Sequence, residues 1–312
     1  MPNLIPFTAA HQADAIAIWN AAAHPDYPIN ERFLAFNTTP CTGESIEGRL
    51  AMQKGEPDGF VLACAAKDNS LGWVSAIAVH PNFQRQGLGS ELLAWAEDWL
   101  KVRLCTRVRI GGSLHPFAPG LPYVMSASLP FFEKYGYSSP AHQPCEYDIA
   151  RSLKDYRSIY PKPDDATLLP MQPGEEPQLL EFLGREYPGR WEFEAKEFVK
   201  GGGRAADYLL LRVDGDVHGF CRLTLADSER PIERFYPQRL PRPWGQFGPL
   251  GLSKAMRGRG LGGYLIDGAA VHLQSLGVDG CVIDWTSLVD LYGKFGFTEY
   301  NRYVTLFKDL KS

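Results

Sequence analysis

Two stretches of the sequence decide the fold: Gln84-Arg85-Gln86-Gly87-Leu88-Gly89 and Arg257-Gly258-Arg259-Gly260-Leu261-Gly262. Each follows an apolar run with the character of a strand and opens an amphipathic run that predicts a helix. Glycine residues at such a turn let the backbone approach a ligand closely, because they have no Cβ. Backbone N–H groups at the start of a helix attract phosphate groups. The two stretches therefore predict two sites for a phosphorylated cofactor.

An aromatic segment with a Lys-x-Gly pattern follows each glycine turn. It reads Phe131-Phe132-Glu133-Lys134-Tyr135-Gly136-Tyr137 in the first half and Leu291-Tyr292-Gly293-Lys294-Phe295-Gly296-Phe297 in the second. The opening strands, Leu4-Ile5-Pro6-Phe7 and Leu168-Leu169-Pro170-Met171, also correspond. Because the whole set recurs in one order, with offsets that agree to within a loop's length, the sequence indicates an internal duplication.

The rest of the sequence predicts the same order of elements in each half. We expect strands at 49–53, 60–66, 73–79 and 107–110 in the first half, strands at 208–213, 217–225, 246–252 and 280–284 in the second, and helices at 11–20 and 175–183. A further helix follows each glycine turn, and another lies in each aromatic tail. Strands and helices therefore predict a mixed α/β fold of the α+β type, with a mixed sheet, present twice.

The length and composition of the chain fit this organisation. A chain of 312 residues is about the length of two ordinary domains. Its hydrophobic content of 45% and charged content of 22% are typical of a soluble globular protein. The charged and proline-containing segment 152–165 is typical of a linker. We therefore expect an N-terminal domain at 1–151, a linker at 152–165 and a C-terminal domain at 166–312.

Charge and hydropathy exclude several classes of function. The formal net charge of −4 argues against a nucleic-acid-binding protein, which would carry a basic surplus. No stretch approaches the roughly 20 apolar residues that a membrane-spanning helix needs, so we expect no membrane partner. The start of the chain, Met1-Pro2-Asn3, lacks the layout of a signal peptide. The expected location is therefore the cytoplasm.

Cysteine and histidine positions do not indicate a metal site. The six cysteines show no C-x-x-C spacing, and the histidines show no H-E-x-x-H pairing. Cys64, Cys221 and Cys281 lie inside apolar strand-like runs, where a free thiol behaves as a small buried apolar group. We expect neither a metal nor a structural disulfide.

Three phosphate-binding motifs compete for the glycine turns. A Walker-type loop is excluded, because neither turn continues with Gly-Lys-Ser/Thr. Gly258-x-Gly260-x-x-Gly263 satisfies the dinucleotide fingerprint, and Asp284 ends the next strand, where a ribose-binding acid would lie. That fingerprint starts at the strand end, however, whereas residues 253–257 intervene here. An NAD(P)-dependent enzyme stays an alternative, as does a plain strand-to-helix turn with solvated arginines.

The third motif accounts for more residues. The pattern Q/R-x-x-G-x-G after an apolar strand, followed by a tail of the F-Y-x-K-x-G-F type, resembles the acetyl-CoA-binding core of GNAT-superfamily N-acetyltransferases. The resemblance covers both halves apart from the linker, so the chain is similar to a tandem GNAT protein. It implies two GNAT-like acyl-CoA N-acyltransferase domains with acetyl-CoA as cofactor.

The resemblance also assigns cofactor-binding residues. In that family the pantetheine arm lies along the strand before the glycine turn, and main-chain amides of the turn bind the pyrophosphate. In the first domain these roles fall on Ile77, Val79, Arg85, Gln86, Gly87, Leu88, Gly89 and Ser90. In the second domain they fall on Leu250, Leu252, Arg257, Gly258, Arg259, Gly260, Leu261, Gly262 and Gly263.

Catalytic candidates differ between the halves. The family often supplies the acid as a tyrosine of the tail helix; Tyr292 has that place in the second half and Phe132 in the first. Proton transfer from a phenol to a thiolate is uphill by about 2 kcal/mol, which a positioned hydroxyl can overcome. Asp284 is the candidate base, and a helix-capping role is its structural alternative. We therefore expect the C-terminal domain to catalyse and the N-terminal domain to bind acetyl-CoA.

The expected reaction is the direct attack of a primary amine on acetyl-CoA. The acceptor is expected to be a small molecule or a peptide amine, and the chain a monomer or a homodimer. A non-catalytic acetyl-CoA sensor or interaction module is the alternative from another class. The sequence does not name the acceptor.

Overall fold

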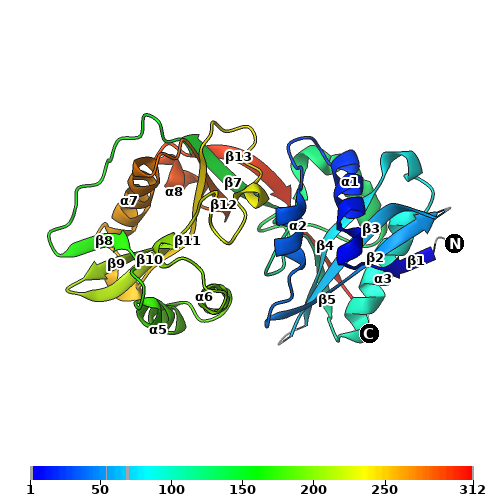
Figure 1. The fold of residues 1–312 in the computed structure, drawn as a ribbon, viewed down its shortest axis with the longest axis horizontal. Coiled ribbons are helices and arrows are strands. Elements are labelled where there is room, and N and C mark those ends of the chain that lie inside the picture. The colour runs from blue at the N-terminus through cyan, green and yellow to red at the C-terminus, as the bar shows by residue number, and fades with distance from the viewer. Residues whose placement is uncertain (1–2, 54, 68–69, 311–312) are drawn as a thin grey trace. The chain divides into compact units, whose positions relative to one another are not determined.

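The computed structural model describes residues 3–53, 55–67 and 70–310, and Figure 1 shows its mixture of helices and strands. The chain forms two compact units. Unit 1 comprises Met1–Glu146 and Asn301–Ser312, and unit 2 comprises Tyr147–Tyr300. The mixed α/β class predicted from the sequence is confirmed in both units.

The sheet of unit 1 is antiparallel except at one pair of strands. Its order is β1-β2-β3-β4-β5-β14, and β4 and β5 run parallel. The strands are β1 (Asn3–Pro6), β2 (Glu44–Gln53), β3 (Glu56–Ala66), β4 (Leu71–Val79), β5 (Arg107–Ile110) and β14 (Leu306–Asp309). The helices are α1 (Gln12–Ala22), α2 (Glu31–Thr38), α3 (Leu88–Val102) and α4 (Leu129–Lys134).

Helix α3 packs one apolar face on this sheet. Leu88, Leu92 and Ala96 recur at the helical spacing of four residues and are at most 1% exposed, in one core with Val61 and Val74 of the sheet. Each buried leucine contributes roughly 1.5–3 kcal/mol of hydrophobic free energy. This packing fixes the start of α3, and with it the glycine turn, at the end of β4.

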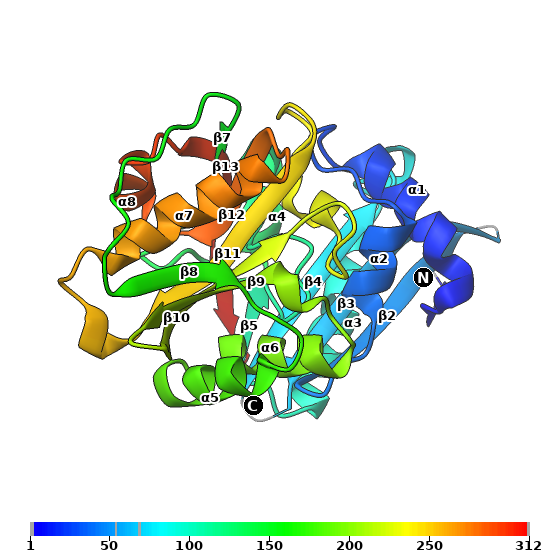
Figure 2. The same cartoon turned by 60° about the vertical axis from the view of Figure 1, so that its left-hand side comes forward.

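Unit 2 repeats the plan. The sheet order from its outer strand is β8-β9-β10-β11-β12-β7-β13-β6, with β11 and β12 parallel. The short strand β6 (Leu121–Pro122) pairs with the end of β13 that lies beyond Tyr300 and belongs to unit 1. The strands are β8 (Ala166–Pro170), β9 (Tyr208–Val213), β10 (Asp216–Thr224), β11 (Trp244–Leu252), β12 (Gly280–Thr286), β7 (Cys145–Ser152) and β13 (Thr298–Val304). The helices are α5 (Glu176–Glu186), α6 (Arg190–Lys200), α7 (Leu261–Ser275) and α8 (Val289–Gly293). Figure 2 shows α7 lying against this sheet, where it contacts β10 and β11.

Each unit takes a strand from the other half of the sequence. Strand β14, at the end of the chain, pairs antiparallel with β5 of unit 1, where Leu306 lies opposite Ile110. Strand β7, which ends the first half, pairs antiparallel with β12 of unit 2, where Arg151 lies opposite Cys281. The compact units therefore differ from the sequence domains 1–151 and 166–312, which remain a prediction about the duplicated segments. Residues 153–165, within the expected linker, form no helix or strand.

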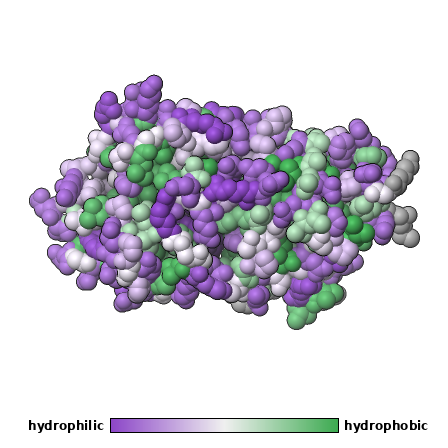
Figure 3. All heavy atoms as spheres, viewed as in Figure 1, coloured by the Kyte–Doolittle hydropathy of each residue, from purple (hydrophilic) through white to green (hydrophobic). Residues whose placement is uncertain are grey.

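The described residues include no helix that combines the length and apolar character needed to span a membrane. The face seen in Figure 3 is mostly hydrophilic, with smaller apolar areas between the polar ones. Exposed apolar side chains such as Val102 and Leu104 are 78% and 82% accessible. Single exposed apolar residues of this kind are ordinary on protein surfaces.

Candidate active site

Strands β4 and β5 separate within unit 1. They pair from Leu71 to Val74 on β4, and the last main-chain bond runs from Gly111 N–H to Val74 O over 2.9 Å. Gly111 and Gly112 then take φ angles of 72° and 83°, which turn the chain away from the sheet. Strand β4 continues to Val79. One edge of its second half therefore faces a gap between the two strands.

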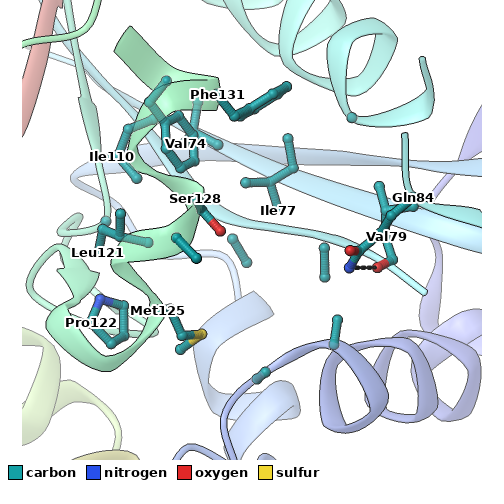
Figure 4. Close-up of a pocket in the computed structure, with 18 of the residues that line it drawn as sticks. Val74, Ile77, Val79, Gln84, Ile110, Leu121, Pro122, Met125, Ser128 and Phe131 are labelled. Carbon is teal, nitrogen blue, oxygen red and sulfur yellow. Dashed lines mark hydrogen bonds between the residues drawn. The ribbon is translucent and has the colours of Figure 1, made fainter. Parts of the chain in front are cut away.

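The backbone of Ile77 and Val79 points into this gap. His80 N–H donates to Asp58 O on β3 over 2.8 Å, and main-chain groups alternate in direction along a strand. The groups of Ile77 and Val79 therefore point away from β3. Val79 O accepts a hydrogen bond of 3.0 Å from the Gln84 side chain, as Figure 4 shows.

A cavity of about 620 Å³ opens at this edge. It is lined by the second half of β4, the glycine turn, α4 and the segment before it, and the end of α1. Figure 4 shows Val79 and Gln84 at one end and the apolar side chains of Ile110 and Leu121 at the other. The charged residues that line it are Arg85 and Lys134, and no carboxylate is among its described lining residues.

The glycine turn of unit 1 presents main-chain amides to this cavity. Gly87 is the N-cap of α3 with φ 92°, and no side chain caps the helix. A Cβ built at Gly87 would meet nothing within 4 Å, so the approach to the turn is open. N–H groups in the first turn of a helix have no partner inside it and suit an anion. The geometry fits the phosphorylated cofactor predicted from the sequence.

Most of the residues predicted for the first cofactor site line the cavity. They are Ile77, Val79, Arg85, Gly87, Gly89 and Ser90. Gln86 and Leu88 are not among them: the Gln86 side chain donates to Asn82 O over 3.3 Å, and the Leu88 side chain is buried in the core. Both belong to the turn through their backbone.

The glycine turn of unit 2 has the same main-chain conformation as the turn of unit 1. Strands β11 and β12 pair only from Trp244 to Gln246 on β11, and β11 continues to Leu252. Gly260 is the N-cap of α7 with φ 78°, and Gly258 has φ 82° where its counterpart Arg85 has φ 63°. At Gly258, Gly260 and Gly262 an added Cβ would meet nothing within 4 Å. Both turns therefore share one backbone conformation.

The edge of β11 in unit 2 differs from the edge of β4 in unit 1, because a side chain of the protein hydrogen-bonds to its main chain. Leu252 is the counterpart of Val79, and its N–H donates to the Tyr187 hydroxyl over 2.8 Å. That hydroxyl donates in turn to Leu252 O over 2.6 Å. The main-chain groups of Leu252, one of the two residues expected to hold a pantetheine arm in this unit, are thus already bound.

Side chains also lie in the space beside the second turn. A Cβ at Gly263 would come within 2.2 Å of the Tyr160 ring, which stacks on Phe295 with centroids 5.5 Å apart. At the matching place in unit 1, Ser90 accepts a hydrogen bond of 2.6 Å from Tyr135. Leu261 is 1% exposed, and Leu250 packs on the same core. Arg257 and Arg259 are exposed, and Arg259 pairs with Asp165.

Of the two predicted catalytic residues of unit 2, Tyr292 is buried and Asp284 is half-buried. Tyr292 is 7% exposed within the hydrophobic core. Burial raises the pKa of its phenol well above the ordinary value, and the charge of Asp284 adds to the rise. A raised pKa keeps the phenol protonated and makes it a weaker acid. Phe132, its counterpart in unit 1, is buried and also lines the cavity.

The half-buried Asp284 borders a cluster of buried polar side chains. Its Oδ1 accepts a hydrogen bond of 2.7 Å from Gln246, whose amide also donates to Gly248 O over 3.0 Å. Arg230 donates to the oxygens of Gln246, Gly248 and Thr224 over 2.5–3.0 Å. Burial lowers the pKa of Arg230 to about 9, with repulsion from neighbouring arginines adding to the effect. These bonds connect Asp284, through Gln246, to the buried side chain of Arg230.

Three residues of these sites were missed in the sequence: Ser128, Tyr187 and Arg230. Ser128 lines the cavity of unit 1, and the other two occupy the strand edge and the interior of unit 2. The described residues contain no group of three His, Cys, Asp or Glu side chains arranged to hold a metal ion.

The sequence matches the Acetyltransferase (GNAT) family over residues 12–116 and 176–297. The chain therefore belongs to the GNAT acetyltransferase family, with one match in each half. A comparison with curated proteins gives no significant match.

Solved structures share the fold over the whole chain. A GCN5-related glucosamine N-acetyltransferase region of a fungal multi-domain GH3 β-N-acetylglucosaminidase has a TM-score of 0.86 and 20% identity, over 99% of this chain. This chain spans 38% of that protein's length. A tandem GNAT protein from the clavulanic acid biosynthesis pathway has a TM-score of 0.71 and 14% identity, covering 100% of this chain and 99% of its own. A GCN5-related N-acetyltransferase from Sphaerobacter thermophilus has a TM-score of 0.67 and 19% identity, covering 99% and 96%.

Proposed function

We propose that this chain is an acetyl-CoA-dependent N-acetyltransferase that binds and uses its cofactor in unit 1. The cavity on the β4 edge carries the proposal, because strand edge, helix N-terminus and open volume meet there. This proposal reverses the expectation that the C-terminal domain catalyses. The roles predicted for Tyr292 and Asp284, and for the second cofactor-binding set, remain predictions of that alternative.

In the proposed complex the backbone of Ile77 and Val79 holds the pantetheine arm as a neighbouring strand would. One of these N–H groups polarises the thioester carbonyl. Main-chain amides of residues 85–90 hold the pyrophosphate, and the basic side chains of Arg85 and Lys134 meet the remaining phosphate charge. The apolar end near Ile110 and Leu121 receives the acetyl group.

Unit 2 has the same glycine turn, but the main chain at the edge of its strand β11 is already hydrogen-bonded to Tyr187. A pantetheine arm on β11 would have to displace the Tyr187 hydroxyl from both groups of Leu252. Losing a buried hydrogen bond without a replacement costs about 1–3 kcal/mol, so binding to unit 2 starts from a deficit. We infer one acetyl-CoA molecule per chain.

The acceptor is an amine that enters the cavity. No carboxylate among the described lining residues is available there to form an ion pair with it. A primary ammonium group has a pKa near ~10.4 in water, and removal from water lowers it. A cavity lined by basic and apolar groups therefore favours the neutral amine, which is the nucleophile. The solved structure described as a glucosamine N-acetyltransferase region makes glucosamine the first acceptor to try.

A matched pair of variants tests the site. Gly87→Glu and Gly260→Glu place the same acid at the same left-handed N-cap, each where an added Cβ meets open space. We expect Gly87→Glu to weaken acetyl-CoA binding by about 100-fold or more, measured by calorimetry, because a carboxylate would face the pyrophosphate. Gly260→Glu should leave it unchanged. The opposite ranking would move the site to unit 2.

A second candidate function is acetyl-CoA binding without turnover. It is favoured by Phe132, which puts an apolar ring where the family often has its catalytic tyrosine. Saturable binding of acetyl-CoA together with no thiol release across a panel of amines would support this reading. Thiol release with glucosamine or another amine would exclude it.

A further inference from the structure

The two tail helices each carry a hydroxyl-bearing residue, but at different positions. In unit 2 the pair is Leu288 and Tyr292, and in unit 1 the corresponding pair is Ser128 and Phe132. Ser128 and Leu288 are the N-cap residues of α4 and α8. Residues four apart lie on the same face of a helix. Each tail helix thus carries one hydroxyl at these two positions, placed one turn apart.

The Ser128 hydroxyl is not used to cap its helix. A serine at an N-cap usually accepts a hydrogen bond from the N–H of the second or third helical residue. Here the second residue is Pro130, which has no N–H, and the side chain forms no cap bond. Ser128 is exposed and lines the cavity. Figure 4 shows its hydroxyl directed into the cavity, on the side of Ile77.

The Ser128 hydroxyl faces the expected position of the thioester. In the proposed complex the pantetheine arm follows Ile77 and Val79, and the acetyl group lies toward Ile110 at the apolar end. The coenzyme A sulfur joins the pantetheine arm to the acetyl group. In the proposed complex it therefore lies between Ile77 and Ser128. Phe132 lines the same cavity but has no proton to share.

We propose that Ser128 is a catalytic residue of unit 1, whose hydroxyl donates a hydrogen bond to the coenzyme A sulfur as it leaves. The inference rests on the proposed cofactor site. The amine nitrogen attacks the acetyl carbon, the C–N bond forms and the C–S bond breaks. The nitrogen loses one proton and the sulfur gains one. Ser128 gives its proton to the sulfur while it takes the proton of the amine, so it ends the cycle unchanged.

The test compares Ser128→Ala with Ser126→Ala in the full chain. Ser126 lies in the same segment and is not among the residues that line the cavity. Thiol release from acetyl-CoA is measured with glucosamine as the probe amine and with water alone, and acetyl-CoA affinity by calorimetry. Ser128→Ala should lower kcat by about 10- to 100-fold, the worth of a hydrogen bond to a developing charge, with unchanged acetyl-CoA affinity. Ser126→Ala should retain kcat.

A double variant separates chemistry from structure. Ser128→Ala with Phe132→Tyr restores a hydroxyl one turn away, as in unit 2, and should regain part of the lost kcat. An unchanged kcat in Ser128→Ala, while acetyl-CoA binding still depends on Gly87, would overturn the role of Ser128 alone. Acetyl-CoA binding that ignores Gly87 would overturn the proposed site as well. A chain that binds acetyl-CoA through Gly87 but releases no thiol under either condition would overturn the role of Ser128 and leave the cofactor site standing.

Discussion

The Tyr187 hydroxyl makes two hydrogen bonds to the main chain of Leu252, one as acceptor and one as donor. Its ring packs against Phe182, Trp191 and Phe220. At the matching position of unit 1, Val79 O accepts a hydrogen bond from the exposed Gln84 side chain. A rigid ring seated in a core is harder to displace than a flexible amide. One residue therefore accounts for much of the difference between the two strand edges.

Tyr187→Phe should lower the free energy of unfolding by about 1–3 kcal/mol, because Leu252 N–H and C=O lose their partner while the ring packing remains. Urea denaturation measures the change. Tyr264→Phe, at a half-buried tyrosine of the same unit, serves as the control and should change stability much less. Equal effects of the two substitutions would mean that the Tyr187 hydroxyl does not hold the edge.

The backbone of the two glycine turns follows a local rule. Left-handed φ angles at Gly87 and Gly260 follow from the short glycine turn before an amphipathic helix, which the sequence displays directly. Tyr187 could not be foreseen, since its partner Leu252 lies 65 residues away and a bond to a distant backbone leaves no local pattern. Ser128 was missed because its importance comes from the cavity it faces.

At the scale of elements, the exchanged strand β14 completes unit 1. Its four residues pair with β5 along its whole length, and Leu306 is 1% exposed in the core that also holds Val108 and Ile110. A sheet without this strand would expose the edge of β5 and part of the core. The end of the chain thus supports the strand that forms one side of the cavity.

Leu306→Ala should destabilise the protein by about 2–5 kcal/mol, as expected when a fully buried leucine leaves a cavity. The control is Asp309→Ala on the same strand, where the side chain is 90% exposed and the ion pair with Arg107 is weak. Chemical denaturation gives both values. A change at Leu306 as small as that at Asp309 would show that β14 contributes little to the fold.

Element prediction succeeded for the elements around the two glycine turns and missed several others. The strands at 73–79 and 208–213 and the helices after both glycine turns occur as expected. Helices α2 and α6 were missed, and so were β7, β13 and β14. Strands β7 and β14 are completed only by partners from the other half of the chain, and such long-range pairing is not encoded by the spacing of nearby residues.

At the scale of the whole molecule, the duplication gave two units with the same turn and different strand edges. The family and the repeated fold were readable from the sequence, because glycine turns and aromatic tails recur in one order. The proposal that unit 1 holds the cofactor could not be reached in this way. It depends on side chains that reach the strand edge from elsewhere in the fold, such as Tyr187 in unit 2.

A crystal structure of the full chain with acetyl-CoA tests the central claim most directly. We predict one cofactor per chain, with its pyrophosphate on the amides of residues 85–90 and its pantetheine arm along Ile77 and Val79, while Tyr187 keeps both bonds to Leu252. A cofactor lying along Leu250 and Leu252 with the Tyr187 hydroxyl displaced, and none in the cavity of unit 1, would contradict the account.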